Sequence, residues 1–145
     1  MAQVNCSLFM PFSVTKMYSL VNDIESYPEF LSGCVSSQIL DSNPTVIIAS
    51  MDILITGIMH QTLVTHNTLT NNHSIHIQLI QGPFRQLNGI WRFNSQDIEA
   101  CHITFNLHVE FNHIFMELAF NKICQQLSKK FLEIFYQRAR EVYCV

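Results

Sequence analysis

Hydrophobic and polar residues alternate most cleanly over residues 101–111, CHITFNLHVEF. Successive side chains of a β-strand point to opposite faces, so a period of two predicts a strand with one buried face. The residues predicted to face inward are Cys101, Ile103, Phe105, Leu107, Val109 and Phe111, and those predicted to face outward are His102, Thr104, Asn106, His108 and Glu110.

Four more segments have the character of strands. SIHIQLI (74–80) alternates in the same way, with Ile75, Ile77 and Leu79 inward. TVIIASMDILI (45–55) is more continuously apolar, and its inward residues are Ile47, Ala49, Met51, Ile53 and Ile55. IMHQTLVTHNTL (58–69) and LNGIWRFN (87–94) complete the set. Turn-forming residues separate the segments, at Asn43-Pro44, Gly57, Asn71-Asn72, Gly82-Pro83 and Ser95-Gln96-Asp97, which predicts an antiparallel meander.

The two ends of the chain differ from this middle region. VNCSLFM (4–10) predicts a first strand, and Ser13, after Pro11, is a favourable N-cap for a short helix. Residues 114–143 have apolar side chains at three- and four-residue spacing, which predicts one amphipathic helix of about 45 Å. The apolar stripe of this helix is Met116, Phe120, Ile123, Leu127, Phe131 and Phe135.

The predicted order is therefore one strand, two short helical pieces, six strands and a long helix. Each element must bury its apolar side, so we expect an α+β fold in which a curved antiparallel sheet wraps around the terminal helix. At 145 residues, the chain has the length of one domain, residues 1–145.

Composition predicts a cytoplasmic domain. The apolar runs are too short to span a bilayer, and the N-terminus does not have the pattern of a signal peptide. The five cysteines are scattered, odd in number and contain no Cys-x-x-Cys pair, which favours reduced thiols over disulfides or a zinc site.

The net charge of −3 is unevenly distributed. Residues 1–112 have three bases against eight acids, whereas residues 113–145 have five bases against three acids. The basic helix could contact phosphate, or its charges could simply be solvated.

Most titratable residues lie on the outward face of the predicted strands: Asp52, His60, His66, His76, Arg92, His102, His108 and Glu110. An enzyme needs a positioned acid, base or nucleophile in its cavity, so this pattern predicts a protein without catalytic activity.

The histidines do not have the spacing of a metal site. His60 and His66 are six residues apart on one strand, as are His102 and His108, and the resulting distance of about 20 Å is too long for both to bind one ion. We therefore expect no metal and no cofactor chemistry.

Two apolar loops and one glycine favour a hydrophobic pocket between the sheet and the helix. Residues 24–31 are rich in bulky side chains, although loops are usually polar, and Gly82-Pro83 predicts a turn that presents Phe84. Gly89 lies within a strand, where glycine often marks the close approach of another group, and Trp91 follows on the same face. The candidate ligand-binding residues are Tyr27, Phe30, Leu31, Phe84, Trp91, Phe105, Phe120, Ile123 and Leu127.

The two loops also carry a family resemblance. NDIESYPEFLSGC (22–34) resembles the D-x-x-x-Y-P-x-F-L segment of the coenzyme-Q-binding START-like family, part of the SRPBCC or polyketide cyclase superfamily. GPFRQLNGIWRF (82–93) resembles that family's G-P-F-[KR]-x-L-x-G-x-W-x-F segment. The matching residues are Asp23, Tyr27, Pro28, Phe30 and Leu31 in the first motif, and Gly82, Pro83, Phe84, Arg85, Leu87, Gly89, Trp91 and Phe93 in the second. Ser32 stands where the family often has proline.

The resemblance implies a helix-grip fold, with residues 24–31 as an apolar flap near the mouth of a cavity. It also implies two functions, because one branch of the family binds ubiquinone in support of respiration, and a bacterial toxin branch binds the large ribosomal subunit and blocks subunit association. We expect binding of ubiquinone or another isoprenoid or lipid, with transient contact to the inner membrane, because the interior is apolar. Ribosome contact through Lys122, Lys129 and Lys130 is the alternative, and a polyketide cyclase is the least favoured. An antitoxin partner is not identifiable from the sequence.

Overall fold

The structure is a computed structural model that describes residues 2–54 and 60–144. The elements are β1 (Ala2–Met10), α1 (Val14–Asn22), the 3₁₀ helix η1 (Ile24–Glu29), β2 (Cys34–Asn43), β3 (Val46–Leu54), β4 (His60–Thr70), β5 (Ser74–Gln81), β6 (Gln86–Asp97), β7 (Ala100–Glu110) and α2 (Ile114–Tyr143). This order confirms the predicted one, and the bounds of the terminal helix are those predicted from its apolar spacing.

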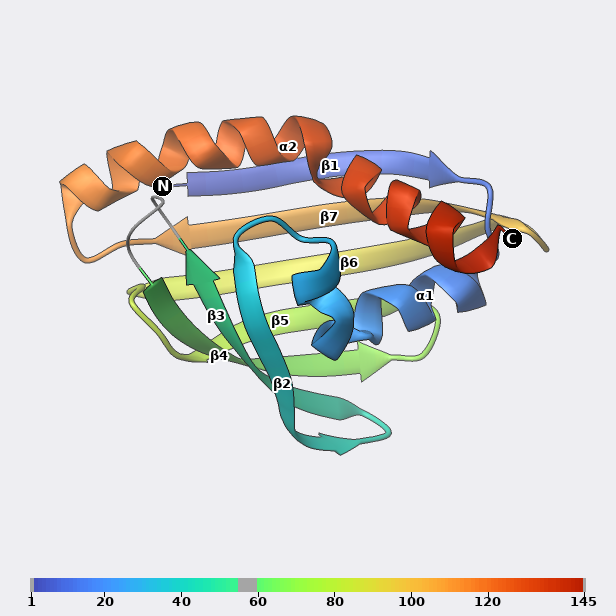
Figure 1. The fold of residues 1–145 in the computed structure, drawn as a ribbon, viewed down its shortest axis with the longest axis horizontal. Helices are drawn as coiled ribbons and strands as arrows, with labels where there is room; N and C mark the ends of the chain where they lie inside the picture. The colour runs from blue at the N-terminus through green and yellow to red at the C-terminus, as the bar shows by residue number, and fades with distance from the viewer. Residues whose placement is uncertain (1, 55–59, 145) are drawn as a thin grey trace.

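The seven strands form one antiparallel sheet in the order β1-β7-β6-β5-β4-β3-β2. Figure 1 shows the sheet curving around the helices, with α2 lying along β1 and β7 and with α1 beside it on the same side. The first and last strands of the meander, β2 and β7, are therefore far apart in the sheet. The curvature of the sheet brings η1, which lies next to β2, towards the C-terminal half of α2. The concave side of the sheet encloses the apolar core.

Strand alternation is confirmed wherever the sequence pattern is regular. In β7, Cys101, Ile103 and Val109 are almost fully buried, while His102 and His108 on the other face are partly exposed. Ile55, which was predicted to face inward, lies outside the described residues. The first two residues of the predicted strand 58–69 also lie outside them.

Strand β2 had no predicted bounds, although a sixth middle strand was expected. Its register with β3 is irregular between Cys34 and Ser36 and again between Ile39 and Asp41. Each irregularity breaks the two-residue period, and most of β2 is exposed at the edge of the sheet. The apolar pattern that marks the other strands is therefore absent here.

The short helix α1 begins as predicted. The Ser13 hydroxyl accepts a hydrogen bond from the backbone N–H of Lys16 at 3.2 Å, which satisfies one of the free donors at the helix start. Met17, Leu20 and Val21 are the buried side chains of this helix. The chain then continues as η1, whose buried residues are Ile24 and Tyr27.

Helix α2 packs on the sheet through a face slightly different from the predicted one. Its buried residues are Cys124, Leu132, Phe135 and Ala139, so Phe135 alone of the predicted stripe is buried. The other predicted residues are only partly buried along one side of that face. Figure 1 shows α2 bending near its middle. There, the Ser128 hydroxyl donates to the Cys124 carbonyl at 2.9 Å, a back-bond that often bends helices.

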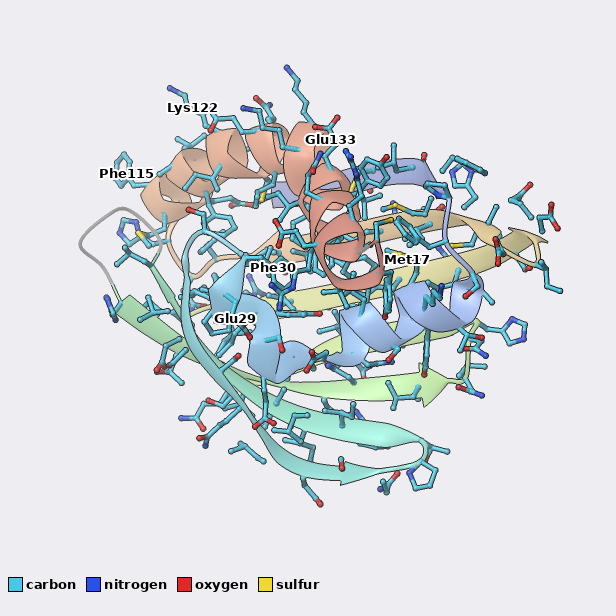
Figure 2. The ribbon with its side chains drawn as sticks, turned by 45° about the vertical axis from the view of Figure 1, so that its right-hand side comes forward. Met17, Glu29, Phe30, Phe115, Lys122 and Glu133 are labelled. Atoms are coloured by element: carbon cyan, nitrogen blue, oxygen red, sulfur yellow. The ribbon has the colours of Figure 1, made fainter. Side chains whose placement is uncertain are left out.

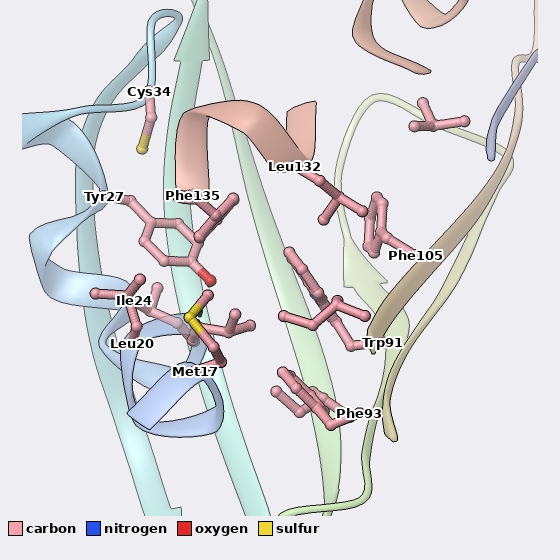
Figure 3. Close-up of a cluster of buried hydrophobic side chains, with 14 of the residues drawn as sticks. Met17, Leu20, Ile24, Tyr27, Cys34, Trp91, Phe93, Phe105, Leu132 and Phe135 are labelled. Atoms are coloured by element: carbon pink, nitrogen blue, oxygen red, sulfur yellow. Dashed lines mark hydrogen bonds between the residues drawn. The ribbon is translucent and has the colours of Figure 1, made fainter. Parts of the chain in front are cut away.

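Phe135 is the largest of the fully buried side chains. It packs between the first helices and the sheet, close to Tyr27 and Trp91, whose ring centroids are 5.7 and 5.1 Å away (Figure 3). Fully burying a side chain of this size contributes about 1.5–3 kcal/mol to stability. In residues 2–54 and 60–144, no helix is long and apolar enough to cross a bilayer.

Candidate ligand-binding cavity

A cavity of about 210 Å³ lies between the concave face of the sheet and the three helices. The sequence left open whether side chains fill this space; in the structure they leave it partly empty. The lining residues are Val21, Asn22, Ile24, Tyr27, Leu31, Met51, Ile53, Leu63, Thr65, Asn67, Ile75, Ile77, Phe84, Leu87, Trp91, Phe105, Leu107, Val109, Phe120 and Phe131. Fourteen of these twenty side chains are pure hydrocarbon, so the cavity is suited to an apolar ligand.

Two groups of aromatic rings border the cavity. In the first group, the centroid of Phe105 lies 4.5 Å from that of Trp91 and 4.9 Å from that of Phe131. In the second group, the Phe84 centroid lies 6.0 Å from that of Phe120. Each pair joins a strand or turn of the sheet to α2 or to the neighbouring strand. The rings are thus held by packing on both sides, which gives the cavity rigid walls.

Residues after α1 form the wall opposite Trp91. Ile24 and Tyr27 come from η1, and Leu31 follows it. The Tyr27 hydroxyl donates a hydrogen bond to the Val21 carbonyl, and burial raises the pKa of Tyr27 far above its usual value, with a smaller effect from Cys34 and Asp23. The ring is therefore fixed in its neutral form. This segment packs as part of the wall, and whether it opens as a flap stays a prediction.

Three polar side chains interrupt the apolar lining. Thr65 and Asn67, two apart on the inner face of β4, are each only 5% exposed, and they are the only polar residues in the described part of the chain that are this deeply buried. Asn22, the last residue of α1, also lines the cavity. The side-chain oxygens of Asn22 and Asn67 are buried without a hydrogen-bond partner. The sequence pattern did not single out these residues: no inward residues were assigned on 58–69, which contains Thr65 and Asn67, and Asn22 lies just before the first motif residue.

Six of the nine predicted ligand-binding residues line the cavity: Tyr27, Leu31, Phe84, Trp91, Phe105 and Phe120. Their role in binding stays a prediction. Phe30, Ile123 and Leu127 do not line it, so their predicted placement there was wrong.

Each of these three residues is displaced for a physical reason. Phe30 packs edge-to-face behind Tyr27 and against Phe135, with centroid distances of 5.7 and 5.3 Å. Because α2 presents Cys124 to the core, Ile123, one residue earlier, is turned away from the cavity. Leu127 is partly buried and packs against the hydrophobic core instead. The helix thus contributes Phe120 and Phe131 to the cavity wall.

The eight acidic, basic and histidine residues predicted to face outward on the strands lie on the outer face of the sheet. Asp52 accepts hydrogen bonds from the hydroxyls of Ser36 (2.6 Å) and Thr62, which lower its pKa and link β2, β3 and β4. Of the described residues that line the cavity, Tyr27 is the only one with a titratable side chain. Over the same described ranges, no three His, Cys, Asp or Glu side chains are grouped so that they could hold a metal ion.

Comparison with known proteins identifies the family. The family described as polyketide cyclase / dehydrase and lipid transport matches residues 10–136. The chain belongs to this family. Among members and relatives, the ribosome association toxin RatA of Escherichia coli (strain K12) is 43% identical over 143 residues, which cover 99% of this chain and 90% of that protein. The mitochondrial coenzyme Q-binding protein COQ10 homolog B of Xenopus laevis is 22% identical over 94% of this chain and 57% of that protein.

Solved structures of polyketide cyclase and START proteins share the fold. A START superfamily protein from Mycobacterium smegmatis superposes with a TM-score of 0.84 at 18% identity, covering 98% of this chain and 99% of that one. The Zhui aromatase/cyclase of a Streptomyces species has a TM-score of 0.84 at 12% identity, covering 98% and 96%. The predicted family resemblance and the helix-grip fold are both confirmed. At these identities the structural likeness shows the fold alone.

Proposed function

We propose that this member of the polyketide cyclase family binds a hydrophobic small molecule in the cavity, without catalysis. The observation that carries the proposal is the cavity itself, whose walls are aliphatic and aromatic and are held by packing on both sides. An isoprenoid quinone or a similar lipid is the ligand class that fits best. The coenzyme Q-binding relative supports this class, although at 22% identity.

The absence of catalysis rests on the chemistry of the lining. Acid–base catalysis requires a group that exchanges a proton near neutral pH. Of the described lining residues, Tyr27 alone is titratable, and its hydroxyl is bonded to the Val21 carbonyl with a pKa raised by burial. A cyclase would need a second, ionisable partner in the cavity, so polyketide cyclase activity is the least favoured of the three functions.

The cavity volume limits how much of a ligand it holds. At about 210 Å³ it is smaller than the ~300–1,000 Å³ typical of sites for drug-sized ligands. It has room for a ring or the first part of a chain. Burying about 200 Å² of apolar surface gains about 5 kcal/mol before ordering costs, so a longer tail would add affinity only by contacts beyond this space.

The test is organic extraction of the purified protein followed by mass spectrometry, comparing wild type with Leu107→Phe. Leu107 lines the cavity, so the larger ring should fill it. Leu40→Phe is the matched control, because Leu40 lies on β2 and is 49% exposed. We expect a quinone or lipid at near-stoichiometric amounts in wild type and Leu40→Phe, and at least a fivefold loss in Leu107→Phe. Equal ligand content in all three proteins, or no ligand and no uptake of an added quinone, would contradict the proposal.

Ribosome association is the second candidate. It is favoured by the RatA relative, which is 43% identical over nearly the whole chain. Lys122, Lys129 and Lys130 on α2 are exposed, and Figure 2 shows Lys122 pointing away from the sheet. Lys122 and Lys129 are seven residues apart and so share a face of the helix. Glu133 follows Lys129 by four residues and weakens the local positive charge, which is why this function ranks second.

Co-sedimentation with large ribosomal subunits over a salt series tests this second function. A contact of three lysines with phosphates predicts a log–log salt slope of roughly −2 to −3. The Lys122→Gln, Lys129→Gln, Lys130→Gln triple variant should lose binding, whereas Lys16→Gln, at an exposed position on α1, should retain it. Leu107→Phe should also retain it, which separates this function from ligand binding. Equal co-sedimentation by the triple variant would exclude this face of α2.

A further inference from the structure

We propose that the ligand of the cavity is an apolar molecule carrying a hydroxyl group, that Asn67 accepts the hydrogen bond of this hydroxyl, and that Asn22 accepts from a second hydroxyl where the ligand has one. This inference rests on the proposed function and narrows its ligand class. It is carried by two buried amide oxygens that have no partner in the protein.

The unpartnered side-chain oxygen of Asn67 is the stronger of the two observations. The Asn67 side chain lies on the inner face of β4, which also presents the apolar Leu63 and the polar Thr65, and only 5% of Asn67 is exposed. In the register of the sheet, Asn67 is opposite Ile47 of β3 and Ile77 of β5. An apolar residue would fit these neighbours better, because a buried acceptor without a donor destabilises the folded state. A ligand that donates a hydrogen bond explains why a polar residue stands here.

Asn22 lines the same cavity as Asn67, and the way in which α1 is anchored accounts for its position. The Asn72 side-chain amide donates to the Thr15 hydroxyl at 3.4 Å, which anchors the first turn of α1 at the β4–β5 turn. From there α1 runs back over the sheet (Figure 1). Seven helical residues from Thr15 to Asn22 advance about 10 Å, and about three strand residues back from Thr70 to Asn67 cover the same length. The helix and the strand thus bring both acceptors to the wall of the same cavity.

The chemistry of the two sites selects a donor. Both unpartnered atoms are oxygens, so the matching group on the ligand is a hydrogen-bond donor, such as an O–H, rather than a carbonyl. Thr65, two residues before Asn67 on the same face, adds a hydroxyl that can accept or donate. The rest of the ligand would lie against Trp91, Phe105 and Phe131, which supply no donor or acceptor along their ring faces. Among quinones, this arrangement favours the reduced form, which carries hydroxyl groups.

The experiment compares three probes of nearly equal shape by isothermal titration calorimetry: 4-hexylphenol, its methyl ether 4-hexylanisole, and hexylbenzene. The phenol donates a hydrogen bond, the ether only accepts, and hexylbenzene does neither. We expect the phenol to bind wild type at least tenfold more tightly than the other two. In Asn67→Leu the three affinities should agree within about twofold. Asn94→Leu, at an exposed position of β6, should keep the wild-type preference.

The outcomes separate this inference from the proposed function. Equal binding of the three probes to wild type would overturn the hydroxyl preference and leave apolar binding in the cavity intact. Binding of none of them would overturn both. A second measurement needs no ligand: removing an unpaired acceptor beside a cavity that can hold the larger side chain should raise the Tm of Asn67→Leu by about 2–8 °C. A lower Tm would assign Asn67 a structural role and overturn the inference.

Discussion

A β-carbon on Gly89 would lie 2.9 Å from Cδ1 of Leu107, its partner across β6 and β7. Leu107 lines the cavity, and its terminal methyl occupies the space that the missing side chain of Gly89 leaves. The glycine that the sequence marked as a point of close approach is therefore next to a cavity-lining side chain.

Gly89→Ala should reduce the cavity without unfolding the protein. The contact involves the flexible end of Leu107, which can move towards the empty space, so the expected loss in ligand affinity is about 1 kcal/mol, or about fivefold. Calorimetry with 4-hexylphenol measures it. The Gly89→Ala, Leu107→Ala double variant should recover binding because the second change returns the space. Wild-type affinity in the single variant would show that Leu107 moves elsewhere.

Tyr27→Phe should destabilise the fold while leaving the cavity wall in place. The hydroxyl is the donor to the buried Val21 carbonyl, and its loss leaves that carbonyl unpaired, at a cost of about 1–3 kcal/mol. The ring, which supplies the lining contact, is retained. Urea denaturation measures the change. Tyr18→Phe is the matched control, since Tyr18 is only half-buried, and it should cost less. Equal costs would contradict the importance of the Tyr27 hydrogen bond.

Arg138 should matter more for stability than Glu29, one of the two carboxylates with which it pairs. Its Nη2 lies 3.3 Å from Oε1 of Glu29, and its guanidinium lies 5.1 Å from the ring centroid of Phe30. The side chain of Arg138 is 18% exposed, whereas that of Glu29 is 62% exposed, so solvent screens the ion pair. We expect Arg138→Ala to cost about 1–2 kcal/mol through lost packing on Phe30, and Glu29→Gln to cost less than about 0.5 kcal/mol. Similar costs in urea denaturation would favour the ion pair instead.

Thiol labelling should find one fast cysteine. Burial raises the pKa of Cys101 and of Cys124 to about 11, and both are fully buried, whereas Cys144 is exposed. Because the thiolate is the reactive form, a maleimide at pH 7.5 should modify Cys144 quickly and the buried thiols only on unfolding. Mass spectrometry of wild type and Cys144→Ser checks this. A rapid reaction of the variant would contradict it.

The raised pKa values of Cys101 and Cys124 make the stability of the fold depend on pH. In the unfolded chain these thiols ionise near pH 8.5–9, while in the folded protein they stay protonated up to about pH 11. Their contribution to stability is therefore complete below about pH 8.5 and falls as the pH rises towards 11. Replacing Cys101 and Cys124 by alanine should flatten the alkaline part of the stability profile measured by urea denaturation at several pH values.

The sequence by itself determined the elements whose burial follows a regular period. The alternation of 101–111 depends only on the two faces of a strand, and the bounds of α2 depend on helical spacing, so both were predictable. Strand β2 lacked bounds because its two register irregularities and its exposed edge position remove that period. The two loop motifs identified the family because their residue types and spacing are specific.

The tertiary structure alone decided the cavity and its polar residues. Neither periodicity nor composition specifies how the bent helix sits on the curved sheet, and that placement turns Ile123 and Leu127 out of the cavity wall while Phe120 and Phe131 remain in it. In the sequence, Asn67 is one polar residue among many in a threonine-rich strand. It becomes a candidate binding residue only because the sheet buries it, without a partner, beside space that no side chain fills.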